Sequence, residues 1–370
     1  MLQEKKCLVS AIRGEAVHWP GGYDSGFADN FWNIALQNGV ASLCYSQLYR
    51  KPQWKFLPVK LQNRLHHHVL NAVALEILWK HDLSRFLEVC GSEYPVLLIK
   101  GTHLAYSHYP APYIRTRCDT DMLFPDRVCA ENAGCILHKL GYERRMGIIG
   151  DLISHEFSYD KRGPHGVTFT LDLHHKINNY HFFADIFSFH DLAGRAVVLD
   201  DLSPYARTPC PVDALIIACI HRLAHGPDGI SDRLIWLYDI HLLASRLTAN
   251  EWDDLLAMCR TRNICGICLD GLKMAQNIFL TRMPTRAMRI LRKYTQGDKI
   301  SIRITRSKVM MDLANLGYLH GIRKRCRFVK EHLFPAPAYI FAKYKTDHIL
   351  LLPYLYIRRL IAGIIKMFIR

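Results

Sequence analysis

The chain has 370 residues, of which 50% are hydrophobic and 22% are charged. This balance supplies a sizeable core and excludes an intrinsically disordered chain, and the length suggests two domains or one domain with helical extensions. The net charge of +15 favours anionic partners, namely nucleotides, nucleic acid or acidic lipid. Residues 321–370 hold eleven Lys or Arg and two acids, so +9 of that charge lies there.

The N-terminus, MLQEKKCLVS, has no apolar signal-peptide core. The twelve cysteines follow no regular framework, so we expect reduced thiols and a cytoplasmic protein. No uncharged apolar run of about 18 residues occurs in the sequence, so no membrane-spanning helix is expected.

The first half of the chain alternates between helix and strand patterns. Apolar residues at helical spacing predict helices over 28–49 and 59–90. The apolar run YPVLLIKG (94–101) ends in glycine, which indicates a buried strand, and the next eight residues can form a short helix. A second strand is predicted over 114–124, and a helix over 127–140 that Gly141 ends.

A hairpin is predicted over 155–175, with its turn at 162–166. Its second arm alternates. Apolar residues at the odd positions 167–173 face one way, and polar residues at the even positions 168–174, Asp172 and His174 among them, face the other.

From about Pro211 the pattern is helical again. The predicted helices cover 213–225, 232–247, 251–258, 263–280 and 284–294. We therefore predict an α+β fold with a small mixed-sheet core. Its expected parts are an N-terminal helical region (1–92), the α/β core (93–205), a helical domain (206–300) and a basic helical tail (301–370).

The sharpest chemical feature is the segment Arg115-Thr-Arg117-Cys-Asp119-Thr-Asp121. Alternate residues of a strand share a face, so both arginines and both aspartates are expected to line one side. Carboxylates at this spacing can hold Mg²⁺ through oxygen, with Mn²⁺ as an alternative ion, and the arginines can bind phosphate oxygens. Taken alone, an Asp-x-Asp pair also fits a solvated strand edge, and the arginines also fit plain salt bridges.

Asp172 supplies a third carboxylate from a second strand, with His174 on its face. Three carboxylates from two strands suit a two-metal site for phosphoryl displacement, whereas the alternative places Asp172 on the wet face of an amphipathic strand. Upstream, Lys100-Gly101-Thr102 lies between a strand and a helix. Glycine there lets the backbone approach a phosphate, and Thr102 can cap the helix or touch the phosphate.

The helical domain adds further candidates. His221 and His225 stand at i and i+4 and share a helix face, which fits metal binding or, more commonly, a core or supporting role. Asp239 lies in an apolar helix and needs a partner, for which Arg233 or one of the histidines is predicted. It either orients the site or ties two helices together.

At these residues the chain resembles the polymerase-beta-like nucleotidyltransferase superfamily and, more narrowly, the bacterial family of uncharacterised nucleotidyltransferases (NTP_transf_5). That family's pattern is an apolar strand ending in Lys-Gly, an Arg four residues before Asp-x-Asp, and a later Asp-x-His. The matching segments here are LLIKG (97–101), Arg115 with Asp119-Thr-Asp121, and Asp172-Leu-His174. The family's paired histidines and Arg-x-x-Trp-x-x-Asp stretch are matched by His221, His225, Arg233, Trp236 and Asp239. The chain departs from the superfamily's usual Gly-Ser or Gly-Gly at Gly101-Thr102.

The resemblance implies metal-dependent transfer of a nucleoside monophosphate from an NTP to a hydroxyl-bearing acceptor, either a small molecule or a protein. The catalytic and metal-binding residues are then Asp119, Asp121 and Asp172. The nucleotide-binding residues are Lys100, Gly101, Thr102, Arg115 and Arg117. The supporting residues are His174, His221, His225, Arg233 and Asp239.

Two other functions remain as alternatives. One is a catalytically inactive module that retains the fold and binds a nucleotide or a protein. The other is nucleic-acid binding through the basic tail, which is less favoured because the tail lacks interleaved aromatic and basic residues.

The end of the tail, IRRLIAGIIKMFIR (357–370), predicts an amphipathic basic helix. Its apolar positions are Ile357, Leu360, Ile361, Ile364, Ile365 and Phe368, and its basic positions are Arg358, Arg359, Lys366 and Arg370. The apolar stripe either packs on the protein, which is the commoner arrangement, or lies on an anionic membrane and makes the protein peripheral. Pro353 is expected to separate this helix from the apolar residues before it.

Overall fold

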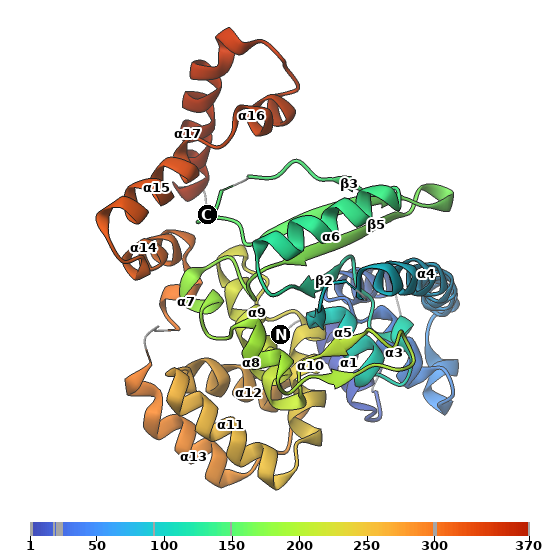
Figure 1. The fold of residues 1–370 in the computed structure, drawn as a ribbon. Helices are drawn as coiled ribbons and strands as arrows, with labels where there is room; N and C mark the ends of the chain where they lie inside the picture. The colour runs from blue at the N-terminus through green and yellow to red at the C-terminus, as the bar shows by residue number, and fades with distance from the viewer. Residues whose placement is uncertain are drawn as a thin grey trace.

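The computed structural model describes residues 3–17, 19, 25–91, 93–148, 150–298 and 302–368. Its central element is a mixed sheet of β1 (Leu97–Ile99), β2 (Thr120–Leu123), β3 (Glu143–Arg144), β4 (Glu156–Arg162), β5 (Thr168–His174), β6 (Val197–Val198) and β7 (Arg207–Thr208). The order is β3-β4-β5-β2-β1-β7-β6, and the pairs β2/β5 and β1/β7 are parallel. This sheet with its flanking helices confirms the predicted α+β class (Figure 1).

The predicted hairpin is confirmed as β4 and β5, which pair antiparallel. Phe157, Tyr159, Leu171 and Leu173 point to one face of the sheet and join a buried core with α4 (Val59–Gly91) and α6 (Arg127–Lys139). Figure 1 shows α6 lying along this hairpin. The alternation leaves the opposite face of β5 to polar side chains, among them Asp172.

The opposite face of β1 and β2 packs on a second, larger core through Ile99 and Leu123. The helices that contribute to this core include α1 (Gln3–Arg13), α2 (Ser25–Gln37), α3 (Ala41–Leu48), α5 (Lys100–Ser107), α7 (His181–Ala184) and α8 (Phe189–Ala193). The N-terminal helices therefore share one core with the helical domain described below.

The predicted helix over 59–90 is confirmed as α4, but the single helix over 28–49 is wrong. The chain forms α2 and α3 with a break at Gly39, whose φ of +68° is left-handed. An α-helix cannot continue through such a residue. A Cβ at Gly39 would also lie 3.2 Å from the guanidinium of Arg233, which would have to shift slightly to make room.

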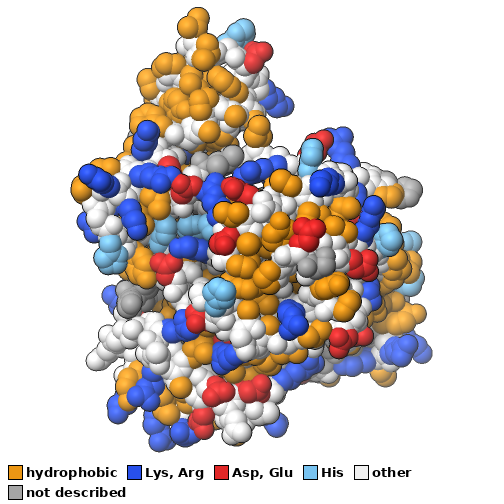
Figure 2. All heavy atoms as spheres, in the orientation of Figure 1, with side chains coloured by type: hydrophobic (Ala, Val, Ile, Leu, Met, Phe, Trp, Pro, Cys, Tyr) orange, Lys and Arg blue, Asp and Glu red, His pale blue; other side chains and the backbone are white. Residues whose placement is uncertain are grey.

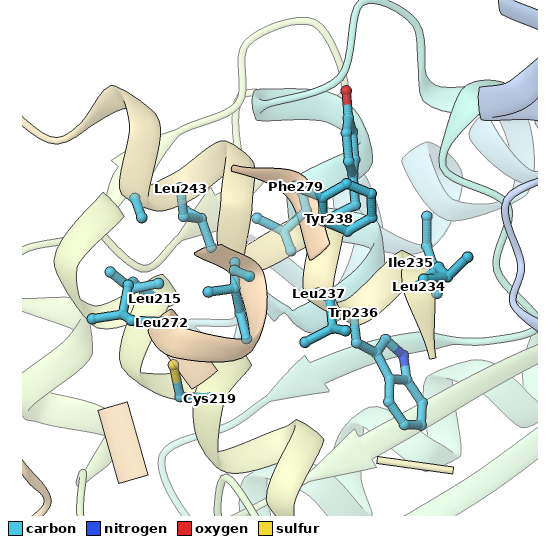
Figure 3. Close-up of a cluster of buried hydrophobic side chains, with 14 of the residues drawn as sticks. Leu215, Cys219, Leu234, Ile235, Trp236, Leu237, Tyr238, Leu243, Leu272 and Phe279 are labelled. Atoms are coloured by element: carbon cyan, nitrogen blue, oxygen red, sulfur yellow. The ribbon is translucent and has the colours of Figure 1, made fainter. Parts of the chain in front are cut away.

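The segment predicted as a helical domain contains α9 (Pro211–Ala224), α10 (Leu234–Arg246), α11 (Ala249–Arg262), α12 (Cys265–Phe279) and α13 (Thr285–Tyr294), close to the predicted helices. Figure 3 shows the apolar side chains where α9, α10 and α12 meet. Leu215 and Cys219 of α9 lie here with Leu272 of α12. A Cβ at Gly271 would come within 2.7 Å of Sγ of Cys219, so glycine permits the close packing of α9 and α12.

The tail forms α14 (Lys308–Tyr318), α15 (Ile322–Leu333), α16 (Pro337–Tyr344) and α17 (Leu352–Phe368), and it projects beyond the sheet (Figure 1). The expected break before α17 lies at Leu352, where the helix begins directly after a 3-10 turn over Ile349–Leu351, rather than at Pro353. Pro353 is the second residue of α17, in the first turn, where the missing N–H has no partner to lose. Among the described residues, no helix has both the length and the apolar character that crossing a bilayer demands.

Candidate active site

Three aspartates meet where β2 and β5 run side by side. These strands are parallel and in register, so Asp121 lies directly beside Asp172, and Asp119 immediately precedes β2. Burial first, and then the charges of Asp121 and Asp172, raise the pKa of Asp119 to about 6. Burial and the Asp121 charge also raise the pKa of Asp172. The three carboxylates therefore interact as one cluster.

Asp121 has two nitrogen partners. Nζ of Lys100 lies 2.6 Å and Nε2 of His174 lies 2.7 Å from Oδ1 of Asp121. Burial acts to raise the pKa of Asp121, but the charge of Lys100 and the hydrogen bond with His174 outweigh it and hold the pKa well below its usual range. Asp121 therefore stays ionised inside a buried acidic cluster.

The turn from β1 into α5 is built around Lys100-Gly101-Thr102. A Cβ at Gly101 would lie 3.2 Å from the guanidinium of Arg115, so the glycine lets that side chain pack against the turn. Thr102 does not cap α5, contrary to one expectation, because the helix begins two residues earlier in the chain. Its hydroxyl is buried and donates to the hydroxyl of Thr120 at 3.1 Å.

The predicted strand over 114–124 is wrong in its first part. β2 covers only Thr120–Leu123, and a 3-10 turn over Pro112–Ile114 precedes it. Arg115 and Arg117 therefore do not share a strand face with the aspartates. The reason lies in their partners, which come from helices far away in sequence.

Arg115 forms a buried ion pair with Asp239 of α10. Its guanidinium donates to Oδ1 at 3.2 Å and to Oδ2 at 2.7 Å, and the hydroxyl of Tyr109 donates to Oδ1 at 2.7 Å. The expectation that Arg233 or a histidine would partner Asp239 is thus wrong. Asp239 instead ties α10 to the segment that leads into β2.

Arg117 is bound by α4. Its guanidinium donates to the two carboxylate oxygens of Glu76 at 2.6 and 3.0 Å and lies 4.8 Å from the ring centre of Trp79. Both arginines are therefore paired with carboxylates, whereas the sequence suggested that they bind phosphate.

The paired histidines form a second wall of the site. The rings of His221 and His225 are 4.8 Å apart, and each packs on Trp236 at 4.8 to 4.9 Å. The guanidinium of Arg233 lies 5.1 Å from the ring of Trp236. His221 lines a narrow cavity together with Lys100. Burial and the Lys100 charge lower the pKa of His221 well below its usual range, so its imidazole is neutral.

Sequence reasoning missed two polar residues of β4. The antiparallel register sets Ser158 beside Asp172 and Glu156 beside His174. The Glu156 carboxylate lies 3.2 Å from Nδ1 of His174, although without hydrogen-bond geometry. Both residues also line a cleft of about 160 Å³. The signal was available, because the first arm of the hairpin alternates polar and apolar residues just as the second arm does.

The chemistry of the cluster fits a hard divalent cation. Asp119, Asp121 and Asp172 offer only oxygen, and Oδ1 of Asp172 is buried with no hydrogen-bond partner among the described residues. Among all the residues that the structure describes, however, no three Asp, Glu, His or Cys side chains are close enough to hold a metal ion together. An ion would therefore draw the carboxylates together by cancelling their mutual repulsion.

Asp119→Asn is expected to stabilise the metal-free protein, and the gain should grow with pH. The folded-state pKa of Asp119, about 6, lies above its ordinary value of 3.8. Folding therefore favours the protonated acid, and this contribution is present below pH 3.8 and lost as the pH rises through 6. Above pH 6 the Asn variant should gain on the order of 1–3 kcal/mol over wild type. Urea unfolding in a chelator from pH 4.5 to 8 measures it, and a difference that does not change with pH would contradict the shift.

Comparison with known proteins finds one matching family. The family model described as uncharacterised nucleotidyltransferase matches residues 25–280, which include the sheet, the carboxylate cluster and the paired histidines. A search of curated proteins finds no match. This match is consistent with the polymerase-beta-like superfamily. Because the match spans more than half of the sequence, the chain belongs to the family of uncharacterised nucleotidyltransferases.

Proposed function

We propose that this protein transfers a nucleoside monophosphate from an NTP to a hydroxyl-bearing acceptor, with release of pyrophosphate. The observation that carries the proposal is the register of β2 and β5, which sets Asp121 beside Asp172 and next to Asp119. Membership of the family supports nucleotidyl transfer in general. The metal dependence and the hydroxyl acceptor, on a small molecule or a protein, are our additions.

Each residue of the cluster has a distinct task in this proposal. Mg²⁺, or Mn²⁺ in its place, held by the three aspartates would neutralise charge on the triphosphate and on the leaving pyrophosphate. Asp172, whose pKa is raised and whose Oδ1 has no partner among the described residues, accepts the proton of the acceptor hydroxyl as it attacks the α-phosphorus. His174 holds the carboxylate of Asp121 in place through Nε2.

The triphosphate is proposed to bind at the start of α5. The first N–H groups of a helix have no partner within the helix, so they can donate to phosphate oxygens near Gly101 and Thr102, and Lys100 adds a positive charge. Arg115 and Arg117 take a different task from the one expected. Because their guanidinium groups are held by carboxylates of α10 and α4, we assign them to positioning the segment before β2.

Of the second wall, His221 lines the narrow cavity together with Lys100, while His225 and Arg233 pack on Trp236. The neutral imidazole of His221 can donate a hydrogen bond to the nucleotide there. The cleft beside Ser158 is the proposed approach for the acceptor, since it adjoins Asp172 in the register of β4 and β5.

Mg²⁺ and NTP together are expected to raise the melting temperature of the protein by more than the sum of their separate effects. The ion neutralises both the carboxylates and the triphosphate, so the two should bind with positive linkage. Differential scanning fluorimetry with ATP and GTP, each with and without Mg²⁺, measures this. Merely additive shifts would argue against a shared site.

A catalytically inactive module that binds a nucleotide or a protein is the second candidate, and the engaged arginines are the observation that favours it. It predicts the same linked stabilisation by Mg²⁺ and NTP but no consumption of NTP in any cell extract. The intact cluster of aspartates favours the enzyme.

We also propose that the tail contacts anionic membrane. Part of α17 packs on protein, since Leu355 is buried and Arg359 donates to the carbonyl of His332. Another face is uncovered. It carries Tyr354, Ile357 and Ile361, which are 59%, 56% and 52% exposed, and Leu350 in the 3-10 turn just before α17 is 91% exposed. Figure 2 shows hydrophobic side chains gathered at this projecting tip.

The exposed tip residues recur at helical spacing and lie within the most basic part of the chain. Apolar burial together with roughly 1 kcal/mol per basic residue near an anionic surface would hold such a helix at a membrane. The predicted stripe is described only in part, because the side chains of residues 364–368 and all of residue 370 lie outside the described residues.

Removal of residues 349–370 is expected to abolish co-sedimentation with vesicles of anionic lipid at low salt. Because truncation also uncovers the partners of Leu355, Ile357→Glu with Ile361→Glu tests the same face in the full-length chain. Val128→Glu on α6, which replaces another exposed apolar residue, should bind vesicles like wild type. Full-length protein that does not co-sediment with anionic vesicles at low salt would contradict the membrane proposal. It would support the alternative in which the apolar stripe only packs on the protein.

A further inference from the structure

Lys100 places a full positive charge inside the carboxylate cluster. Its Nζ lies 2.6 Å from Oδ1 of Asp121 and 3.3 Å from Nε2 of His174, and only 14% of its side chain is exposed. The ion pair places the cationic nitrogen of Lys100 directly against a carboxylate oxygen of the cluster.

The backbone of Lys100, at the turn from β1 into α5, adopts a strained conformation. Its φ is +55°, in the left-handed region that side chains rarely adopt. The other described non-glycine residues with positive φ are Asn263, Leu280 and Lys345, and each ends a helix, where this conformation is common. Lys100 instead begins one. Strain of this kind persists where a function requires it, and here it accompanies the contact between Nζ and Asp121.

The contact occupies an oxygen that a two-metal site would need. Two divalent ions that share a phosphoryl-transfer site lie roughly 3.5–4 Å apart, bridged by carboxylate oxygens. Oδ1 of Asp121 already has an ammonium at 2.6 Å and an imidazole at 2.7 Å. A divalent ion at that oxygen would have to displace Nζ of Lys100, and the nearby ammonium charge would repel the ion.

We propose that the ammonium group of Lys100 takes the place of one of the two divalent cations, so that the protein binds its nucleotide with a single Mg²⁺ or Mn²⁺. This inference rests on the proposed function and specifies its metal requirement. Asp119, Asp172 and the second carboxylate oxygen of Asp121 remain for the ion. Lys100 supplies the second positive charge that the clustered carboxylates and the triphosphate need.

The test counts Mn²⁺ ions per bound nucleotide. Electron paramagnetic resonance measures free Mn²⁺ while it is titrated into full-length protein that holds a non-hydrolysable NTP analogue, with the protein in excess. Wild type is expected to bind one ion per nucleotide at saturation. A count of two would overturn the inference. This readout does not depend on turnover or on the identity of the acceptor.

Lys100→Met sharpens the test, because it keeps the length of the side chain and the backbone strain but removes the charge. The variant is expected to bind two Mn²⁺ per nucleotide, and to bind Mn²⁺ alone at least about tenfold more tightly than wild type. Lys161→Met is the matched control, since Nζ of Lys161 lies 2.6 Å from Asp82 in an ion pair between β4 and α4. The control should still bind one ion, and a folded Lys100→Met protein that binds only one would overturn the inference.

Failure of this inference can be told from failure of the proposed function. Wild type that binds two Mn²⁺ together with the nucleotide keeps the proposed function and overturns only the role of Lys100. Wild type that binds neither Mn²⁺ nor the nucleotide analogue overturns both.

Discussion

Asp119→Asn and Asp121→Asn are each expected to reduce transfer of the nucleoside monophosphate to background, a loss of at least about 10²-fold, with the fold intact. Asparagine has the same shape as aspartate but lacks the negative charge that binds the cation. The cation in turn stabilises the negative charge that develops in the transition state, so its loss slows the reaction. Ground-state binding should suffer less than turnover, because that charge is largest at the transition state.

Transfer of an α-phosphate label from the NTP measures the effect, and circular dichroism checks the fold. Asp253→Asn is the matched control, since Asp253 forms an exposed ion pair with Arg286 at 2.7 Å on the helical domain. It should retain full activity. If either active-site variant kept near wild-type turnover, the assignment of the cluster would be wrong.

Asp239→Ala is expected to destabilise the protein by about 3–5 kcal/mol, because it leaves the guanidinium of Arg115 buried without its counter-ion. Arg115 and Asp239 are 6% and 3% exposed, and Tyr109 also loses its acceptor. The pair joins α10 to the segment before β2, so loss of stability should be accompanied by weaker binding of NTP.

Urea unfolding of the variant measures the change in the free energy of unfolding. Arg115→Met combined with Asp239→Leu should recover much of the stability, since no buried charge is then left unpaired. Arg286→Ala, which breaks an exposed pair, should change stability by less than about 1 kcal/mol. A loss below about 1 kcal/mol for Asp239→Ala would show that the pair is not a structural tie.

Local periodicity was sufficient to predict the parts of the fold in which neighbouring residues alternate. The hairpin of β4 and β5 is the clearest case, because a two-residue period by itself puts Asp172 and His174 on one face of a strand. The helices of the helical domain were predictable for the same reason, with a longer period. The contact between the predicted acidic residues then required only that β2 and β5 be neighbours in the sheet.

The tertiary partners of the arginines could not be read from local patterns. Arg115 has its counter-ion 124 residues away in α10, and Arg117 has its own 41 residues away in α4. Because these ion pairs hold both arginines, the strand predicted over 114–124 forms only at Thr120–Leu123. The strained turn at Lys100 was equally invisible, because nothing in a Lys-Gly pair distinguishes a left-handed lysine from an ordinary one.

Transfer of the α-phosphate itself tests the central claim most directly. Full-length protein is incubated with Mg²⁺, cell extract and each of the four NTPs, labelled in parallel at the α-phosphate and at the γ-phosphate. Our account predicts that at least one NTP labels an acceptor from the α-phosphate only, and that a chelator or the combined Asp119→Asn and Asp121→Asn substitutions remove the signal. Labelling from the γ-phosphate, equal α-labelling by the doubly substituted protein, or no α-labelling with any NTP would contradict it.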